Sequence, residues 1–214
     1  MRLVTSSTAA NYGARATSFA SWAEQQGAAA RTARERLSEY RERPFQALLD
    51  VGCGSGRDAI AFARAGAGRV VGVDPCRDLV DIAIRNATSS RTPCTFHVGD
   101  IVDPPVTWDP ALPDDIEFDG VFALASLFHI PKRDLPEALA NIARTTSPDA
   151  VMLTTFPVGE GDGPMPDGRW RTALTMDEHD QLLASAGFAP VNRSAISIYN
   201  GVWDTVVSLK NTAT

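Results

Sequence analysis

The period of hydrophobic and polar positions changes several times along this chain. From Ser18 to Arg43 the residues are mainly Ala, Glu, Gln and Arg, which predicts a helix that stops before Pro44. Gly27 should break or bend that helix. Residues 1–17 are small and polar with no apolar period, so we expect them to be mobile in the absence of a ligand.

From Phe45 onward, short apolar runs alternate with amphipathic segments. The apolar runs predict strands at about 46–51, 70–73, 94–98, 118–124 and 150–156. The amphipathic segments predict helices at about 57–65, 77–87 and 134–145. This alternation is typical of an α/β fold with a mostly parallel sheet and crossover helices.

The C-terminal part should close the sheet with a reversed strand. Thr175 and Glu178 form a capping box that begins a helix, and Gly187 is placed to end it. Two β-rich runs then flank Asn200-Gly201, a dipeptide that strongly favours a hairpin turn. Residues 103–117, rich in proline and aspartate, are expected to be an excursion between strands. We expect one domain, with residues 1–44 as a helical extension or lid on a core at 45–214.

Size and charge narrow the class of protein. A length of 214 residues fits one domain, and a net charge of −6 with a pI near 5.0 argues against a nucleic-acid surface. The arginines between 31 and 43 are interleaved with glutamates, as on a solvated helix face. The three cysteines lack metal-ligand spacing, and no signal peptide or membrane-length apolar run is present. We therefore expect a cytoplasmic protein with reduced thiols, no metal and no membrane partner.

A glycine-rich loop follows the first strand of the predicted core. Gly52, Gly54 and Gly56 come after a strand that ends at Val51 and before an amphipathic segment. Glycines there permit positive φ and a close approach of ligand to backbone. Asp74 ends the second strand about 18 residues later, near the roughly 20 expected for a carboxylate that binds ribose hydroxyls. The pattern predicts a site for a nucleoside-bearing cofactor.

Three features disfavour other nucleotide sites. A dinucleotide site would have its third glycine where Arg57 stands. Asp50, just before the loop, would repel a pyrophosphate but suits a ligand that carries a sulfonium and an ammonium. No Lys-Ser or Lys-Thr pair follows the glycines, which excludes a P-loop.

The sequence resembles the class I S-adenosylmethionine (SAM)-dependent methyltransferases from about residue 45 to the C-terminus. The matching motifs are Leu-Leu-Asp-Val-Gly-Cys-Gly-Ser-Gly from residue 48, Gly-Val-Asp-Pro from 72, Val-Gly-Asp-Ile from 98 and Phe-Asp-Gly-Val-Phe-Ala-Leu from 118. The resemblance implies a Rossmann-like, doubly wound sheet of seven strands that ends in an antiparallel hairpin strand, with helices on both faces. It also implies SAM as cofactor and S-adenosylhomocysteine as product.

The resemblance implies further roles at the cofactor site. Asp100 would accept a hydrogen bond from the adenine amine, although a role as a turn cap is the alternative. Ile101 and Pro75 would pack on the adenine, and Leu124 and Ala125 would meet the methionine part of the cofactor. Tyr12 matches a tyrosine that many small-molecule members fold over that methionine.

His129 is the candidate catalytic residue, because an imidazole can take the proton that an oxygen or nitrogen acceptor loses. The alternative is a local hydrogen bond that orients the loop before Pro131. His97 and His179 are expected to be structural, with His179 on a helix surface.

The segment from Phe156 to Trp170 is long for a connection, which often marks a lid or a binding loop. Glu160 and two neighbouring aspartates would suit a substrate amine, and Arg169 and Trp170 offer a charge and a stacking surface. A solvated acidic loop is the alternative.

These patterns together predict a cytoplasmic SAM-dependent methyltransferase, a monomer or homodimer, acting on a small metabolite at oxygen, nitrogen or carbon. A role in natural-product biosynthesis would fit. The alternatives are a SAM-binding protein without transferase activity, an RNA or protein methyltransferase, and, disfavoured by Arg57 and Asp50, an NAD(P)-dependent oxidoreductase.

Overall fold

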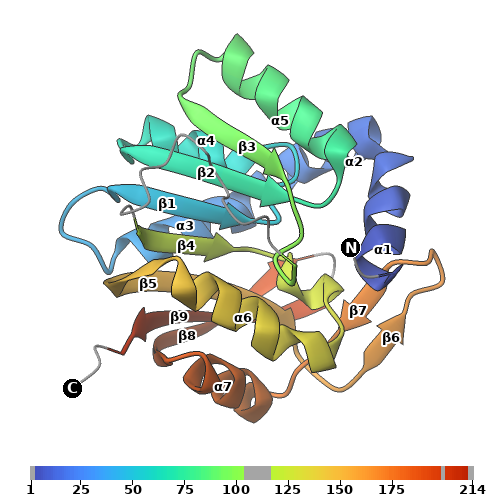
Figure 1. Cartoon of the computed structure of the whole chain (residues 1–214), viewed down its shortest axis with the longest axis vertical. Helices are drawn as coiled ribbons and strands as arrows, with labels where there is room; N and C mark the ends of the chain where they lie inside the picture. Colours follow the sequence, from blue (N-terminus) through green and yellow to red (C-terminus); the bar gives the residue numbers. More distant parts are fainter. Residues whose placement is uncertain (1–2, 104–116, 199–200, 212–214) are drawn as a thin grey trace.

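The computed structural model describes residues 3–103, 117–198 and 201–211. A seven-stranded sheet in the order β3-β2-β1-β4-β5-β9-β8 forms its centre (Figure 1). Its strands are β1 (Ala47–Val51), β2 (Arg69–Asp74), β3 (Cys94–Val98), β4 (Phe118–Ala123), β5 (Thr146–Pro157), β8 (Phe188–Ile198) and β9 (Gly201–Lys210). The predicted mostly parallel sheet is confirmed.

The chain order reverses beside β1, which pairs in parallel with both β2 and β4. Leu49 lies opposite Val71 on one side and opposite Val121 on the other. The crossover connections therefore leave β1 in opposite directions, which opens a crevice outside the carboxyl ends of these strands. Those ends point toward α1 (Leu3–Gly13) and toward the hairpin of β6 (Asp162–Pro164) and β7 (Trp170–Thr172) in Figure 1.

The sheet ends in the expected hairpin. Strand β9 runs antiparallel to both β5 and β8, and Ile198 pairs with Gly201 next to the turn. The reversed strand predicted from the alternating runs around Asn200-Gly201 is thus confirmed, while residues 199–200 of the turn lie outside the described residues.

Helices cover both faces of the sheet (Figure 1). Side chains alternate along β1, so that Leu48 packs with the cluster under α3, α4 and α5, and Leu49 with the cluster under α6 and α7. The bounds are α3 (Gly27–Ser38), α4 (Arg57–Arg64), α5 (Arg77–Ser89), α6 (Leu135–Arg144) and α7 (Met176–Ser185), with short 3₁₀ turns η1 (Leu127–His129) and η2 (Lys132–Asp134). Capping at Thr175 is confirmed, because its hydroxyl accepts from Glu178 N and Glu178 accepts from Thr175 N.

The N-terminal segment corrects one expectation. Residues expected to be mobile form α1 (Leu3–Gly13), followed by α2 (Ala16–Gln25). The small side chains that hide a period allow close packing, since Ala9 and Ala16 are buried against Cys76 and Leu79 at the start of α5. The predicted break at Gly27 is confirmed, but α3 ends at Ser38, several residues before Arg43.

The long segment after β5 holds its own antiparallel pair, β6 (Asp162–Pro164) and β7 (Trp170–Thr172). This hairpin contacts α1 and η1, and Figure 1 shows it beside α1 at the carboxyl edge of the sheet. The segment is therefore a structured flap over the crevice. Of the predicted excursion at 103–117, residues 104–116 lie outside the described residues.

Two further expectations are wrong. His179 is fully buried between Thr154 and Asp204, because α7 turns this residue toward the sheet. The arginines between 31 and 43 are only partly a solvated face, since Arg34 pairs with Asp58 and Arg41 with Asp119. Among the described helices, none has the length and apolar character needed to cross a bilayer.

Candidate active site

Most of the predicted site residues meet in one cavity at the carboxyl edge of the sheet, which we call the inner cavity. It lies at the ends of β1, β2 and β4 and is closed on one side by α1 and α2. The predicted residues that line it are Tyr12, Gly52, Gly54, Asp74, Pro75, Asp100, Ile101, Ala125 and His129. The chain thus gathers residues that are more than a hundred positions apart in sequence.

The glycine loop shapes the floor of the inner cavity. Gly52 and Gly54 adopt φ values of 69° and 53°, and a Cβ added at Gly52 would lie 2.3 Å from the Cβ of Ser126. Any other residue at position 52 would therefore force the loops apart. Gly56 instead caps α4 and packs against Phe96, so it supports the loop without lining the cavity.

Asp74 sits at the end of β2, where its carboxylate holds the glycine loop in place. One oxygen accepts from Gly54 N at 3.0 Å and the other from Cys76 N at 2.8 Å. Burial nevertheless raises the pKa of Asp74 to about 6, and the two amide hydrogen bonds oppose that rise. Each oxygen keeps a lone pair for a further donor.

Asp100 lines the inner cavity and has one carboxylate oxygen without a partner among the described residues. Its Oδ1 accepts from Val102 N at 3.0 Å, which is the turn cap foreseen as the alternative role. Its Oδ2 is buried and, within the described part of the chain, has no hydrogen-bond partner. Ser126 Oγ, also on the cavity wall, is buried without a partner among the described residues. Orphaned buried acceptors are costly, so these two atoms fit a ligand that donates hydrogen bonds.

Besides Gly56, two more predicted cofactor residues lie outside the inner cavity. Asp50 is buried beneath α4, where its Oδ2 accepts from Ala59 N at 3.1 Å, and burial raises its pKa well above the usual value. Its charge therefore does not face the cavity as expected, because the strand directs this side chain under the helix. Leu124 lines an adjoining cavity that shares Gly52 and Ala125 with the inner one.

His129 belongs to a chain of hydrogen bonds across the mouth of the inner cavity. Its Nδ1 lies 2.6 Å from the carbonyl oxygen of Trp170, and its Nε2 lies 2.8 Å from the hydroxyl of Tyr12. A carbonyl only accepts, so Nδ1 carries the proton and Tyr12 donates to a bare Nε2. Arg169 in turn donates to the Tyr12 oxygen at 2.9 Å. The chain joins α1, η1 and β7.

Burial, together with a smaller effect of the nearby Arg169 guanidinium, lowers the pKa of His129 to about 4. The imidazole is therefore neutral at physiological pH. A neutral imidazole of such low basicity is a good hydrogen-bond acceptor but a weak base toward a hydroxyl.

A second, wider cavity, which we call the outer cavity, opens on the far side of Tyr12 and Phe19, which line both. Its wall combines aromatic and cationic side chains from α2, η1, β7 and β9, and from the residues directly before α2 and β7. They are Phe19, Trp22, Phe128, Trp203, Arg15, Arg169 and Arg171.

The acidic residues expected to face a substrate amine are used elsewhere. Asp162 accepts from the Trp170 indole at 2.6 Å, and Asp167 pairs with Arg15 and Arg169. Glu160 is exposed and lines neither the inner nor the outer cavity. Trp170 also lies outside both linings, because the alternation along β7 directs it toward Asp162 and Thr172. Of the three predicted substrate residues, only Arg169 lines the outer cavity.

The sequence interpretation missed several residues of the two cavities. Phe19 and Trp22 lie three positions apart on α2, a spacing that marks one helix face. Arg169 and Arg171 are two residues apart, a spacing that places side chains on the same face of an extended segment, but no strand was predicted there.

Comparison with known proteins places the chain in a family. A family model described as a methyltransferase domain matches residues 48–149. An O-methyltransferase of Pyrenophora dematioidea is 27% identical over 164 residues, which cover 72% of this chain and 58% of that protein. The chain spans about half the length of the curated relatives it matches, between 45% and 58% for the first three.

Two solved structures share the fold. One is the 1,6-didemethyltoxoflavin-N1-methyltransferase of Burkholderia thailandensis, which was solved with 1,6-didemethyltoxoflavin and S-adenosylhomocysteine. It is 22% identical to this chain with a TM-score of 0.78, and the match covers 96% of this chain and 88% of that protein. The [4+2]-cyclase SpnF has a TM-score of 0.66 and 18% identity, covering 86% of this chain and 82% of that one. The family model shows that residues 48–149 form a methyltransferase domain, and the chain as a whole has the fold of the class I SAM-dependent methyltransferases.

Proposed function

We propose that this protein is an enzyme that transfers a methyl group from SAM to a small-molecule acceptor and releases S-adenosylhomocysteine. The observation that carries the proposal is the pair of carboxylates at the inner cavity, Asp74 and Asp100, of which Asp100 keeps a buried oxygen without a partner in the described chain. A ligand with two hydroxyl donors and an amine donor matches this set of acceptors.

The proposed roles follow the positions of the side chains. Asp74 accepts hydrogen bonds from the ribose hydroxyls, and Asp100 Oδ2 accepts from the adenine amine. Pro75 and Ile101 pack on the adenine, while Gly52, Gly54 and Ala125 leave backbone room for the methionine part. Leu124 borders that space from the adjoining cavity. Bound SAM supplies an electrophilic methyl group on a sulfonium.

Helices α1 and α2 are proposed to act as a lid on the core at 45–214. Tyr12 on α1 contributes to the walls of both cavities and is held by Arg169 and His129. A lid that closes on both ligands excludes water and aligns the acceptor with the methyl group, which supplies most of the rate enhancement such a displacement needs.

For His129 we propose a positioning role in place of the proton abstraction that the sequence suggested. Its Nε2 is engaged by Tyr12, and its pKa of about 4 makes proton abstraction from a neutral hydroxyl unfavourable. By binding Tyr12 and the Trp170 carbonyl at once, the imidazole fixes the lid against the flap.

A small-molecule acceptor is favoured because the outer cavity is a walled pocket and the net charge of −6 does not suit a nucleic-acid surface. A cytoplasmic location and a role in natural-product biosynthesis belong to the same proposal, the latter supported by the resemblance to a methyltransferase solved with 1,6-didemethyltoxoflavin.

A SAM-binding protein without methyl transfer is the second candidate, favoured by the shared fold of a [4+2]-cyclase. Incubating the protein with methyl-labelled SAM and fractionated extract of its source organism separates the two. We expect label in the small-molecule fraction, and much less with Asp100→Asn at a SAM concentration below saturation. SAM binding without label in any fraction would favour the second candidate, and label in RNA or protein would contradict a small acceptor.

A further inference from the structure

We propose that the outer cavity binds a planar aromatic acid, so that the methyl acceptor is an organic anion such as an aromatic carboxylate or phenolate. This inference rests on the proposed function, since it names the acceptor class of the same enzyme. It depends on three features of the cavity: its aromatic walls, its excess of positive charge, and its position next to the inner cavity.

Two pairs of aromatic side chains line the cavity. Phe19 and Trp22 on α2 have ring centroids 5.6 Å apart, and Phe128 and Trp203 meet edge to face at 4.8 Å. The exposed side chain of Val202 borders the same space. Rings and an exposed apolar residue around a pocket favour a flat, largely apolar ligand.

The charge on the lining is positive. Arg15, Arg169 and Arg171 line the cavity, and the described lining includes no acidic side chain. Asp167, which lies just outside the lining, pairs with Arg15 at 3.4 Å and with Arg169 at 2.9 Å. The single carboxylate of Asp167 therefore neutralises only part of the charge of Arg15 and Arg169. With Arg171 added, the lining of the outer cavity keeps a net positive charge.

Arg171 is the residue best placed to bind an anion. Within the described part of the chain, no hydrogen bond or ion pair engages its guanidinium. Arg171 lies on the face of β7 opposite Trp170, whose indole donates to Asp162, and Arg169 directly precedes the strand. A guanidinium on the lining of an aromatic pocket, with no partner among the described residues, can bind a carboxylate through two parallel hydrogen bonds.

The position of the cavity suits an acceptor. Tyr12 and Phe19 belong to both linings, so a ligand in the outer cavity lies beside one in the inner cavity. An ionised acceptor also has no proton to lose, and it therefore requires no strong base. The low basicity of His129 is consistent with such an acceptor.

The test compares three probes of the same shape and different charge: 2-naphthoate, 2-naphthamide and 2-naphthylmethylamine. Binding of each is measured by calorimetry on the whole chain saturated with S-adenosylhomocysteine. We expect 2-naphthoate to bind about tenfold more tightly than the amide and the amine to bind weakest, since a charge-assisted bidentate contact is worth about one tenfold step. The preference should shrink with added salt, because a partly exposed pair is screened.

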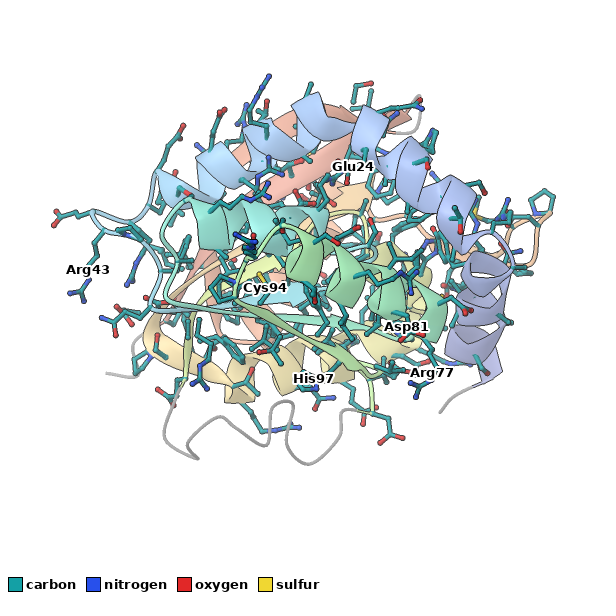
Figure 2. All side chains as sticks on the ribbon, turned by 90° about the horizontal axis from the view of Figure 1, so that it is seen from above. Glu24, Arg43, Arg77, Asp81, Cys94 and His97 are labelled. Carbon is teal, nitrogen blue, oxygen red and sulfur yellow. The ribbon has the colours of Figure 1, made fainter. Side chains whose placement is uncertain are left out.

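Arg171→Gln should abolish the preference of naphthoate over naphthamide while leaving naphthamide affinity unchanged. Arg43→Gln removes the same charge from an exposed residue at the end of the molecule away from α1 and should change neither (Figure 2). Equal binding of acid and amide by the wild type, or an unchanged preference in Arg171→Gln, would overturn the inference. Failure to bind S-adenosylhomocysteine in the first place would instead refute the proposed function, so the two failures are distinguishable.

Discussion

The unpartnered oxygen of Asp100 gives the sharpest prediction of the cofactor assignment. In Asp100→Asn, the amide oxygen still accepts from Val102 N, so the turn after β3 is retained. The amide NH₂ then occupies the place of Oδ2, which is buried and has no partner in the described residues. An NH₂ group facing the adenine amine replaces an acceptor by a second donor, so the hydrogen bond to the ligand is lost.

The magnitude follows from the burial of the carboxylate. Asp100 is only 7% exposed, so little screening by water reduces the interaction. A hydrogen bond to a charged group contributes about 1.5–3 kcal/mol. At about 1.4 kcal/mol per factor of ten, the affinity for S-adenosylhomocysteine should fall roughly 10- to 150-fold. The melting temperature should change little, because the substituted atom has no partner to lose within the described protein.

The assay is calorimetric titration with S-adenosylhomocysteine, together with a thermal melt of each variant. Asp81→Asn is the matched control, since Asp81 is an exposed residue on α5, labelled in Figure 2, and makes the same change of charge away from the inner cavity. An Asp100→Asn protein that binds as tightly as the Asp81→Asn protein would refute the adenine role of Asp100. The remaining function of Asp100 would then be the turn cap alone.

Three further predictions concern the titratable groups of the site and core. Affinity for S-adenosylhomocysteine should fall as the pH drops through about 6, because the carboxyl of Asp74, with its raised pKa, takes up a proton there and loses acceptor capacity. An affinity that stays constant from pH 8 to pH 5 would contradict the role of Asp74 in binding the ribose. His129→Ala should lower kcat about 100-fold with little change in S-adenosylhomocysteine affinity. If the imidazole positions Tyr12 and does not abstract a proton, His129→Gln should recover much of the lost kcat, because a glutamine can still bind Tyr12 and Trp170. Equal losses of kcat in both variants would identify His129 as a base. His179→Ala should cost about 3 kcal/mol of unfolding free energy in denaturant titrations, because it leaves Asp204 buried without its His179 hydrogen bond, while S-adenosylhomocysteine affinity should remain unchanged.

The parts of the site that lie on one short segment were predictable from sequence. The glycine loop and the acid at the end of β2 depend on local geometry, because a strand that turns into a helix needs positive φ at fixed positions. The strands and helices of the core were found within a few residues, since alternation and amphipathic period reflect burial directly. The hairpin of β8 and β9 was predictable because the dipeptide Asn200-Gly201 favours a tight turn between two strands.

The parts that depend on packing between distant segments were not predictable. Helix α1 has too few large side chains to show a period, yet its alanines fit against α5 closely enough to be buried. Asp50 reads as a ligand-facing charge from its place before the loop, while the burial of β1 on both faces directs it beneath α4. The arginines of the outer cavity come from the start of α2 and from the segment around β7, and only the tertiary structure reveals that these two segments lie close together.

The distribution of charge across the two cavities links the cofactor assignment to the acceptor class. The inner cavity is bordered by the carboxylates of Asp74 and Asp100, which favour a cationic ligand, and the outer cavity by three arginines, which favour an anionic one. A displacement between a cationic donor and an anionic acceptor removes both charges as it proceeds, so apolar surroundings that exclude water favour the products over the separated ions. Tyr12 and Phe19, the aromatic pair shared by both cavities, provide such surroundings where the reactants would meet. In the proposed enzyme the rate would come from alignment and charge neutralisation, and the low basicity of His129 is consistent with that proposal.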